Sequence, residues 1–102
     1  MYDCKDCILR LIFSHELYDE MTDVLFSFPE RELEFMSLDI QAHMQSLESI
    51  TEQVSGFKRR KMVEVTIEQG EAKRLHRHIT QSLPQVKFQA QLLPLLTLDE
   101  NL

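Results

Sequence analysis

The chain has 102 residues and a formal charge of −6, with 43% apolar and 27% charged residues. This length and composition predict one globular domain over residues 1–102. The negative charge argues against general nucleic-acid binding, which needs many phosphate contacts from Lys and Arg. No apolar run approaches the roughly 20 residues of a membrane-spanning helix, and no signal-peptide pattern is present. We therefore expect a cytoplasmic protein without membrane insertion.

The first half of the chain predicts a strand, a helix and a second strand. Residues 7–13 form a short apolar run typical of a buried central strand. Ser14 is a candidate N-cap for a helix that continues to about Phe28 and is ended by Pro29. Residues 33–42 alternate as a half-buried strand. Its inward side chains are expected to be Met36, Leu38, Ile40 and Ala42.

The second half repeats the order of strand, helix and strand. Residues 60–68 alternate as a strand with Val63, Val65 and Ile67 buried. A helix is expected over residues 71–83, and a last strand over 86–96 that bends at its proline. The order β-α-β-β-α-β predicts an α+β, ferredoxin-like sandwich, with two helices on one face of a four-stranded antiparallel sheet.

The opposite face of this sheet is expected to be polar. It is either solvated, as open antiparallel sheets often are, or a polar subunit interface in which Arg10 and Glu64 are neighbours on the two central strands. The residues assigned to this face are Arg10, Ser37, Asp39, Gln41, Glu64, Thr66, Lys87, Gln89 and Gln91.

The connection at residues 43–61 is far longer than a hairpin loop needs, and long ordered loops are usually functional. Its last four residues are cations in an otherwise acidic protein: Lys58, Arg59, Arg60 and Lys61. They form a candidate anion site, or they only solubilise the start of a strand. Since strand residues alternate between faces, only one alternate pair is expected to line a given cleft. His43 at the mouth of the loop is a further candidate ligand-binding residue.

The sequence gives little sign of catalysis or of metal binding. No nucleophile–base pair, phosphate-binding loop or dinucleotide motif is present, so we expect a non-enzymatic protein, and no cofactor can be assigned. Cys4 and Cys7 form a CxxC motif, which is a weak metal signal by itself. The alternative interpretation places Cys7 in a strand and Cys4 in a frayed terminus.

The plan β-α-β, long loop, β-α-β resembles that of the PII-like superfamily of signalling proteins. Residues 46–61 read SLESITEQVSGFKRRK and precede a VEV strand, which is similar to an uncharacterised PII-like family often encoded beside heavy-metal efflux systems. Residues 6–13, DCILRLIF, and 92–96, LLPLL, resemble the first and last strands of that family. The long connection at 43–61 then occupies the T-loop position of a single PII-like domain.

The resemblance implies a homotrimer with sheet faces turned towards the threefold axis. It implies that a small anionic ligand or metal complex binds at the loop base and biases the loop between conformations. A regulatory partner protein would then recognise the loop conformation. Residues 83–85 lack a glycine- and lysine-rich phosphate loop, and the long loop lacks tyrosine, so nucleotide binding and uridylylation are not expected. A link to nitrogen regulation or to heavy-metal efflux is implied. CutA-like metal-tolerance proteins share the plan and give the alternative function.

Overall fold

The computed structural model describes residues 6–42 and 58–98. Its elements, in chain order, are β1 (Asp6–Ser14), the 3-10 helix η1 (His15–Leu17), α1 (Tyr18–Phe26), β2 (Phe35–Ala42), β3 (Lys58–Glu68), α3 (Gln69–Ser82) and β4 (Gln89–Pro94). The four strands form one sheet in the order β2-β3-β1-β4, and every neighbouring pair is antiparallel.

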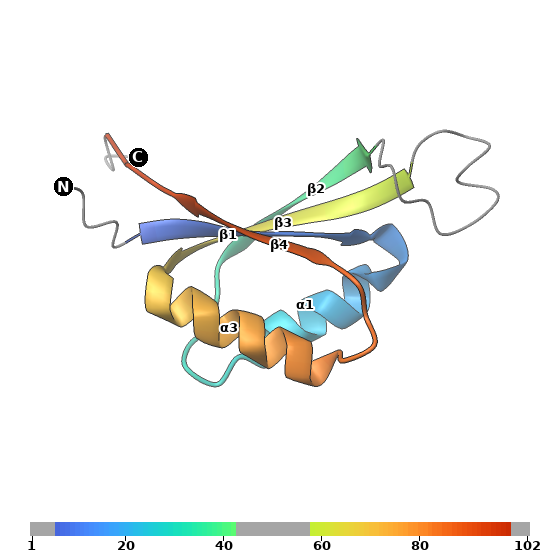
Figure 1. Ribbon diagram of the computed structural model, residues 1–102, viewed down its shortest axis with the longest axis horizontal. Helices are drawn as coiled ribbons and strands as arrows, with labels where there is room; N and C mark the ends of the chain where they lie inside the picture. Colours follow the sequence, from blue (N-terminus) through green and yellow to red (C-terminus); the bar gives the residue numbers. More distant parts are fainter. Residues whose placement is uncertain (1–5, 43–57, 99–102) are drawn as a thin grey trace.

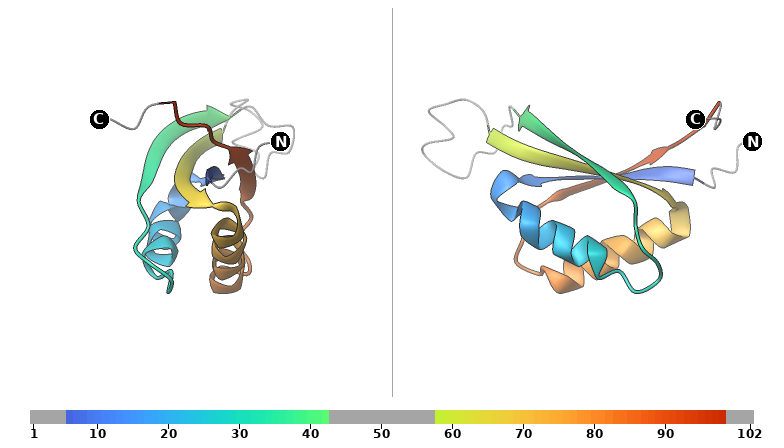
Figure 2. Two further views of the ribbon diagram at one scale, coloured as in Figure 1. Left: turned by 90° about the vertical axis from the view of Figure 1, so that its left-hand side faces the viewer. Right: turned by 180° about the vertical axis from the view of Figure 1, so that it is seen from behind.

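Two layers result, because α1 and α3 lie side by side on the same face of the sheet (Figures 1 and 2). This confirms the expected ferredoxin-like α+β arrangement, with β1 and β3 in the centre. The last strand is shorter at both ends than the predicted 86–96, since it runs from Gln89 to Pro94. No helix within the described residues is long and apolar enough to cross a membrane.

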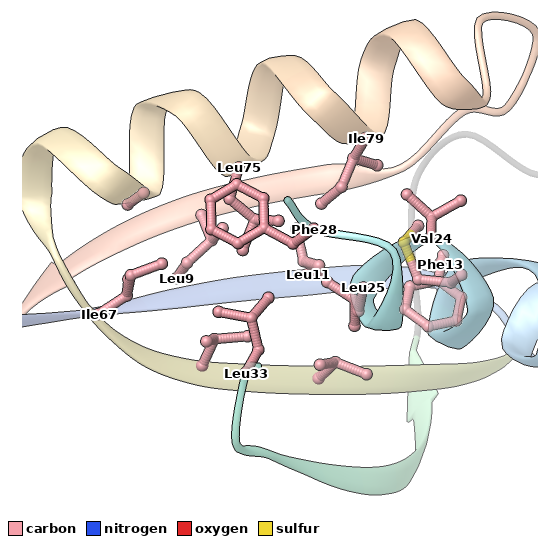
Figure 3. Close-up of a cluster of buried hydrophobic side chains, with 14 residues drawn as sticks. Leu9, Leu11, Phe13, Val24, Leu25, Phe28, Leu33, Ile67, Leu75 and Ile79 are labelled. Carbon is pink, nitrogen blue, oxygen red and sulfur yellow. The ribbon is translucent and has the colours of Figure 1, made fainter. Parts of the chain in front are cut away.

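The core lies between the central strands and the two helices. Alternate residues of β1 face the helices, as do alternate residues of β3, and the inward stripes of α1 and α3 cover them (Figure 3). Val63, Val65 and Ile67 are buried as predicted. The largest fully buried side chains come from all four of these elements: Phe13, Leu11, Met21, Leu25, Ile67, Leu75, Ile79, Val63 and Val65.

The orientation predicted for β2 is wrong. Its register pairs Phe35 with Val65 and Ser37 with Val63, so Phe35 and Ser37 point towards the helices. Phe35 packs against the core and lies 5.5 Å from Phe26, measured between ring centroids. The face of β2 that points towards the helices is therefore only partly apolar. The other apolar residues of this edge strand point to the opposite side of the sheet.

The observed orientation of β2 changes which side chains lie on the open sheet face, which is the face not covered by the helices. Met36, Leu38 and Ile40 belong to it instead of Ser37, Asp39 and Gln41. Met36 is 65% exposed and Leu38 is 48% exposed. The strand registers place further apolar side chains on the same face, namely Ile8, Ile12, Met62 and Leu93. The open sheet face is thus mixed, because these apolar side chains lie among Arg10, Glu64, Thr66, Gln89 and Gln91, which the registers place there as predicted.

At the centre of the open sheet face, Arg10 and Glu64 are direct cross-strand partners, as predicted. Arg10 Nε donates to Glu64 Oε2 at 2.9 Å, and an Arg10 terminal nitrogen lies equally close to that oxygen. The side chains are 30% and 15% exposed. Cross-strand opposite charges stabilise a sheet modestly, and these two also neutralise each other among apolar neighbours.

The helix ends differ from the sequence expectations at two places. Ser14 stands at the N-cap of η1 but makes no side-chain capping hydrogen bond, and α1 ends at Phe26 instead of Phe28. The side chain that caps α3 belongs to Glu68, which accepts from the backbone N–H of Gly70 at 2.9 Å and of Glu71 at 3.3 Å. A carboxylate here also suits the positive end of the helix dipole.

Polar contacts join the C-terminal end of α1, and the turn that follows it, to α3. His78 Nε2 lies 2.9 Å from Ser27 Oγ and 3.2 Å from the Val24 carbonyl oxygen, so α3 supplies a partner to the C-terminal end of α1. At the other end of α3 the turn after α1 forms two ion pairs, Arg31 with Glu71 and Arg74 with Glu30. These contacts fix the helix layer over the core.

The capping carboxylate predicts a pH-dependent contribution to stability. The pKa of Glu68 is lowered from its ordinary 4.5, first by the Gly70 and Glu71 backbone hydrogen bonds. Its contribution is therefore present above pH 4.5 and is lost as pH falls through the depressed folded pKa. We expect Glu68→Ala to destabilise the fold near neutral pH and to have a smaller effect at about pH 3.

Urea denaturation of wild type and variant at both pH values measures this difference. Glu32→Ala, which removes an exposed carboxylate outside the cap, is the matched control. An equal loss of stability for Glu68→Ala at both pH values would show that the carboxylate charge does not matter.

Candidate functional site

A cavity of about 560 Å³ lies where β2 ends and β3 begins, beside the end of β1. Its lining consists of His15, Asp39, Ile40, Gln41, Arg59, Arg60 and Lys61. These residues come from both faces of the strands, which places the cavity at the rim of the sheet. We refer to it as the rim site.

The strand registers bring this set together. Ser14 pairs with Arg60 across β1 and β3, so the residue that follows β1 must lie next to the start of β3. That residue is His15, and its Nδ1 lies 3.3 Å from the Arg59 carbonyl oxygen. A protonated Nδ1 donates in this contact and leaves Nε2 for other partners. The Arg59 side chain itself is exposed.

Arg60 provides the least satisfied polar group of the rim site. The side chain is half-buried, and its Nε is buried with no hydrogen-bond acceptor among the described residues. Buried donors are nearly always paired, and leaving one unpaired costs about 1–3 kcal/mol. An acceptor supplied from elsewhere would remove this cost, so Arg60 Nε marks a position suited to an anionic or carbonyl oxygen.

Lys61 already has partners within the protein. Its Nζ lies 2.6 Å from Asp39 Oδ1, and it lies 4.6 Å from the centroid of the Tyr18 ring. The Tyr18 hydroxyl in turn lies 3.0 Å from Ser37 Oγ. Lys61 thus ties β2 to β3 and to the start of α1, which gives it a structural role at the wall of the rim site.

The electrostatics of the rim site favour negative ligands. The pKa of Asp39 is lowered, first by the hydrogen bond from Lys61, then by the Lys61 charge and by the nearby Arg59 and His15. Asp39 therefore stays ionised and balances one cation. Two arginines remain without a carboxylate partner among the described side chains, and Arg is well suited to binding carboxylate or phosphate oxygens.

The basic run predicted from the sequence lies at the rim site. Arg59, Arg60 and Lys61 all line it, so the expectation that only one alternate pair would line a cleft does not hold at the sheet rim. Lys58 begins β3, but its side chain lies outside the described residues, as does the whole of His43.

The cysteines do not support a metal site in the part of the chain that the structure describes. Cys7 is 3% exposed on the helix face of β1, which is the strand position given by the alternative interpretation. Cys4 lies outside the described residues. Within residues 6–42 and 58–98, no group of three or more His, Cys, Asp or Glu side chains could hold a metal ion.

Sequence reasoning missed His15, Asp39 and Gln41 as members of the rim site. His15 follows the first strand immediately, and an antiparallel partner strand that starts with a basic run would lie beside it. The sequence signal that could have identified His15 was therefore its position at the end of the first strand, together with the strand order that sets this end beside the start of the basic strand. Asp39 and Gln41 were missed because β2 was assigned the wrong orientation.

The sheet order and the two-helix layer define a ferredoxin-like α+β protein with a cationic rim site. Residues 4–98 match the family described as protein of unknown function (DUF3240), and the chain belongs to that family. No curated protein matches the sequence.

A solved structure supports the fold independently. A crystal structure of a DUF3240 family protein from Shewanella baltica OS155 superposes with a TM-score of 0.73 at 12% sequence identity. The match covers 94% of this chain and 96% of that one. At this identity the likeness establishes the fold alone.

The Lys61–Asp39 pair predicts a coupled effect on stability. We expect Lys61→Met and Asp39→Asn each to lower the melting temperature, and the double variant to lose less than the sum of the two. The reason is that either substitution alone already breaks the same contact. A thermal denaturation cycle measures the coupling.

Arg77→Met combined with Asp39→Asn is the matched control, because Arg77 is exposed on α3 and does not line the rim site. Additive effects are expected there. Strict additivity for Lys61 and Asp39 as well would contradict the role assigned to the pair.

Proposed function

We propose that this protein is a non-enzymatic, PII-like regulatory protein whose rim site binds a small anionic ligand. Binding at the base of the connection between β2 and β3 shifts the conformation of that connection, and a partner protein recognises the conformation. The buried, unpaired Nε of Arg60 is the observation that carries this proposal, because it needs an acceptor that the described residues do not supply.

The surroundings of Arg60 support an anion rather than a neutral ligand. Arg59 and His15 add positive or donor groups to the same cavity, while Asp39, the one carboxylate among its described lining residues, already pairs with Lys61. Charge-assisted hydrogen bonds to carboxylate or phosphate are shorter and stronger than neutral ones. The cavity volume of about 560 Å³ accommodates a small metabolite.

We also propose a homotrimer in which the open sheet face is the subunit interface. On this face the exposed Met36 is the cross-strand neighbour of Glu64, which pairs with Arg10, and the exposed Leu38 is the next residue of β2 on the same face. Contiguous exposed apolar patches commonly mark interaction sites, and a charge pair within one fixes the register of the partners. The trimer would bring rim sites close to neighbouring subunits.

The regulatory role would be exercised in the cytoplasm, in nitrogen regulation or in the control of heavy-metal efflux. The PII-like resemblance of residues 46–61 motivates this part of the proposal. The CutA-like metal-binding alternative receives less support, because Cys7 is buried in the core face of β1.

The proposal predicts that binding depends on both arginines of the rim site. We expect Arg59→Ala and Arg60→Ala each to weaken phosphate-bearing ligands by about 1–3 kcal/mol, the cost of losing one charge-assisted hydrogen bond. Higher salt should weaken binding further. Calorimetric titration with inorganic phosphate, pyrophosphate and phosphate-bearing metabolites measures this.

Arg77→Ala is the matched control, because Arg77 is an exposed arginine on α3 that does not line the rim site. It should bind as wild type does. Equal binding by wild type and the Arg60 variant, or equal weakening by the Arg77 control, would overturn the rim site as the binding locus.

The trimer predicts a clear hydrodynamic result. Wild type should sediment as three chains at micromolar concentration, and Met36→Asp combined with Leu38→Asp should sediment as a smaller species. Charges on an interface core are costly to desolvate. Arg77→Asp combined with Gln81→Asp places two charges at exposed positions of α3 and serves as the control that should remain trimeric. A monomeric wild type would contradict the proposed trimer.

A further inference from the structure

A second hollow lies between α3 and the edge strand β4. Its volume is about 220 Å³. Its apolar lining is formed by Leu9, Ala72, Ala90 and Leu92. Its polar lining is formed by Lys73, His76 and Gln91. We refer to it as the edge groove.

The edge groove has the properties of a place for an added strand. Within the described residues, β4 is hydrogen-bonded to β1 on one side only. An extended segment that pairs with the other side of β4 would place alternate side chains towards α3, in the groove. Leu9 and Ala72 give it an apolar floor because they are 4% and 1% exposed, and Leu92 remains 39% exposed at the groove.

The chain itself carries a segment with the complementary pattern. Beyond β4, Leu96 is 65% exposed and Leu98 is fully exposed, and in an extended chain these two side chains point the same way. Asp99 and Glu100 follow in the sequence. An apolar pair followed by two acids matches a groove with an apolar floor and Lys73 beside it.

Residues 95–98 do not enter the groove of their own chain. The Leu95 N–H donates to the Asp6 carbonyl oxygen at 3.2 Å, which holds the chain in line with β1 as it leaves the sheet. From there the chain runs away from α3, on the other side of the sheet, in every view (Figures 1 and 2). A groove within reach of this segment must therefore belong to another molecule.

We propose that residues 95–100 of one copy occupy the edge groove of a second copy, with Leu96 and Leu98 on its floor and Asp99 and Glu100 near Lys73. The contact extends the sheet of the receiving copy by one strand. It is distinct from the open sheet face and from the rim site, and it holds whether or not the rim site binds an anion.

Disulfide trapping between two differently tagged chains tests the proposal. One chain carries Leu98→Cys, the other carries Ala90→Cys, and both carry Cys4→Ser, while Cys7 is left in place because it is buried. Under mild oxidation the mixed chains should form a cross-linked species that joins the two tags. Both substituted side chains are exposed, so neither change should impair folding.

Two comparisons make the result specific. Thr97→Cys in place of Leu98→Cys points its thiol to the opposite side of an extended segment and should cross-link several-fold less. Adding Leu96→Asp to the Leu98→Cys chain should lower the yield roughly tenfold, the effect of losing one buried leucine. Cross-linking no greater than in the Thr97 control overturns the proposal. So does a disulfide that forms only within a chain that carries both cysteines and is insensitive to dilution.

Discussion

The antiparallel pairing of β1 with β3 is the constraint on which the rest of the structure depends. It runs from Asp6 opposite Glu68 to Ser14 opposite Arg60, and it aligns the buried sets of both strands beneath the helices. The same register sets Arg10 against Glu64 on the open sheet face and brings His15 to the start of β3. The core, the face proposed for assembly and the rim site are therefore consequences of one register.

Much of the fold could be predicted from the sequence because β1, β3 and α3 bury a regular apolar set. Val63, Val65 and Ile67 fit a period of two, and Ala72, Leu75 and Ile79 fit a helical period, so pattern and packing agree. In β2 the more apolar set, Met36, Leu38 and Ile40, faces away from the helices, so its alternation predicted the wrong orientation. Its orientation follows from contacts distant in sequence, such as Tyr18 with Ser37 and Phe26 with Phe35, which no local pattern contains.

The rim site was predictable only in part for the same reason. Four adjacent cations at the start of a strand were visible in the sequence, but which of them remain available depends on partners from other elements. Lys61 is held by Asp39, while Arg60 has a buried Nε without a described acceptor. A basic run thus divides into a structural cation and binding cations, and only the three-dimensional neighbours distinguish them. Nor could the pattern place the apolar residues of β2 on the open sheet face, because that placement depends on the orientation of the strand.

The most direct test of this account observes the Arg60 side chain itself. In a ¹⁵N-labelled protein, the Nε–H resonance of each arginine reports whether that donor gains an acceptor. Titration with inorganic phosphate should shift the Arg60 resonance, saturate, and leave that of Arg77 on α3 unchanged. An Arg60 resonance that does not move, or one that moves no more than that of Arg77, would contradict an anion site at the rim of the sheet.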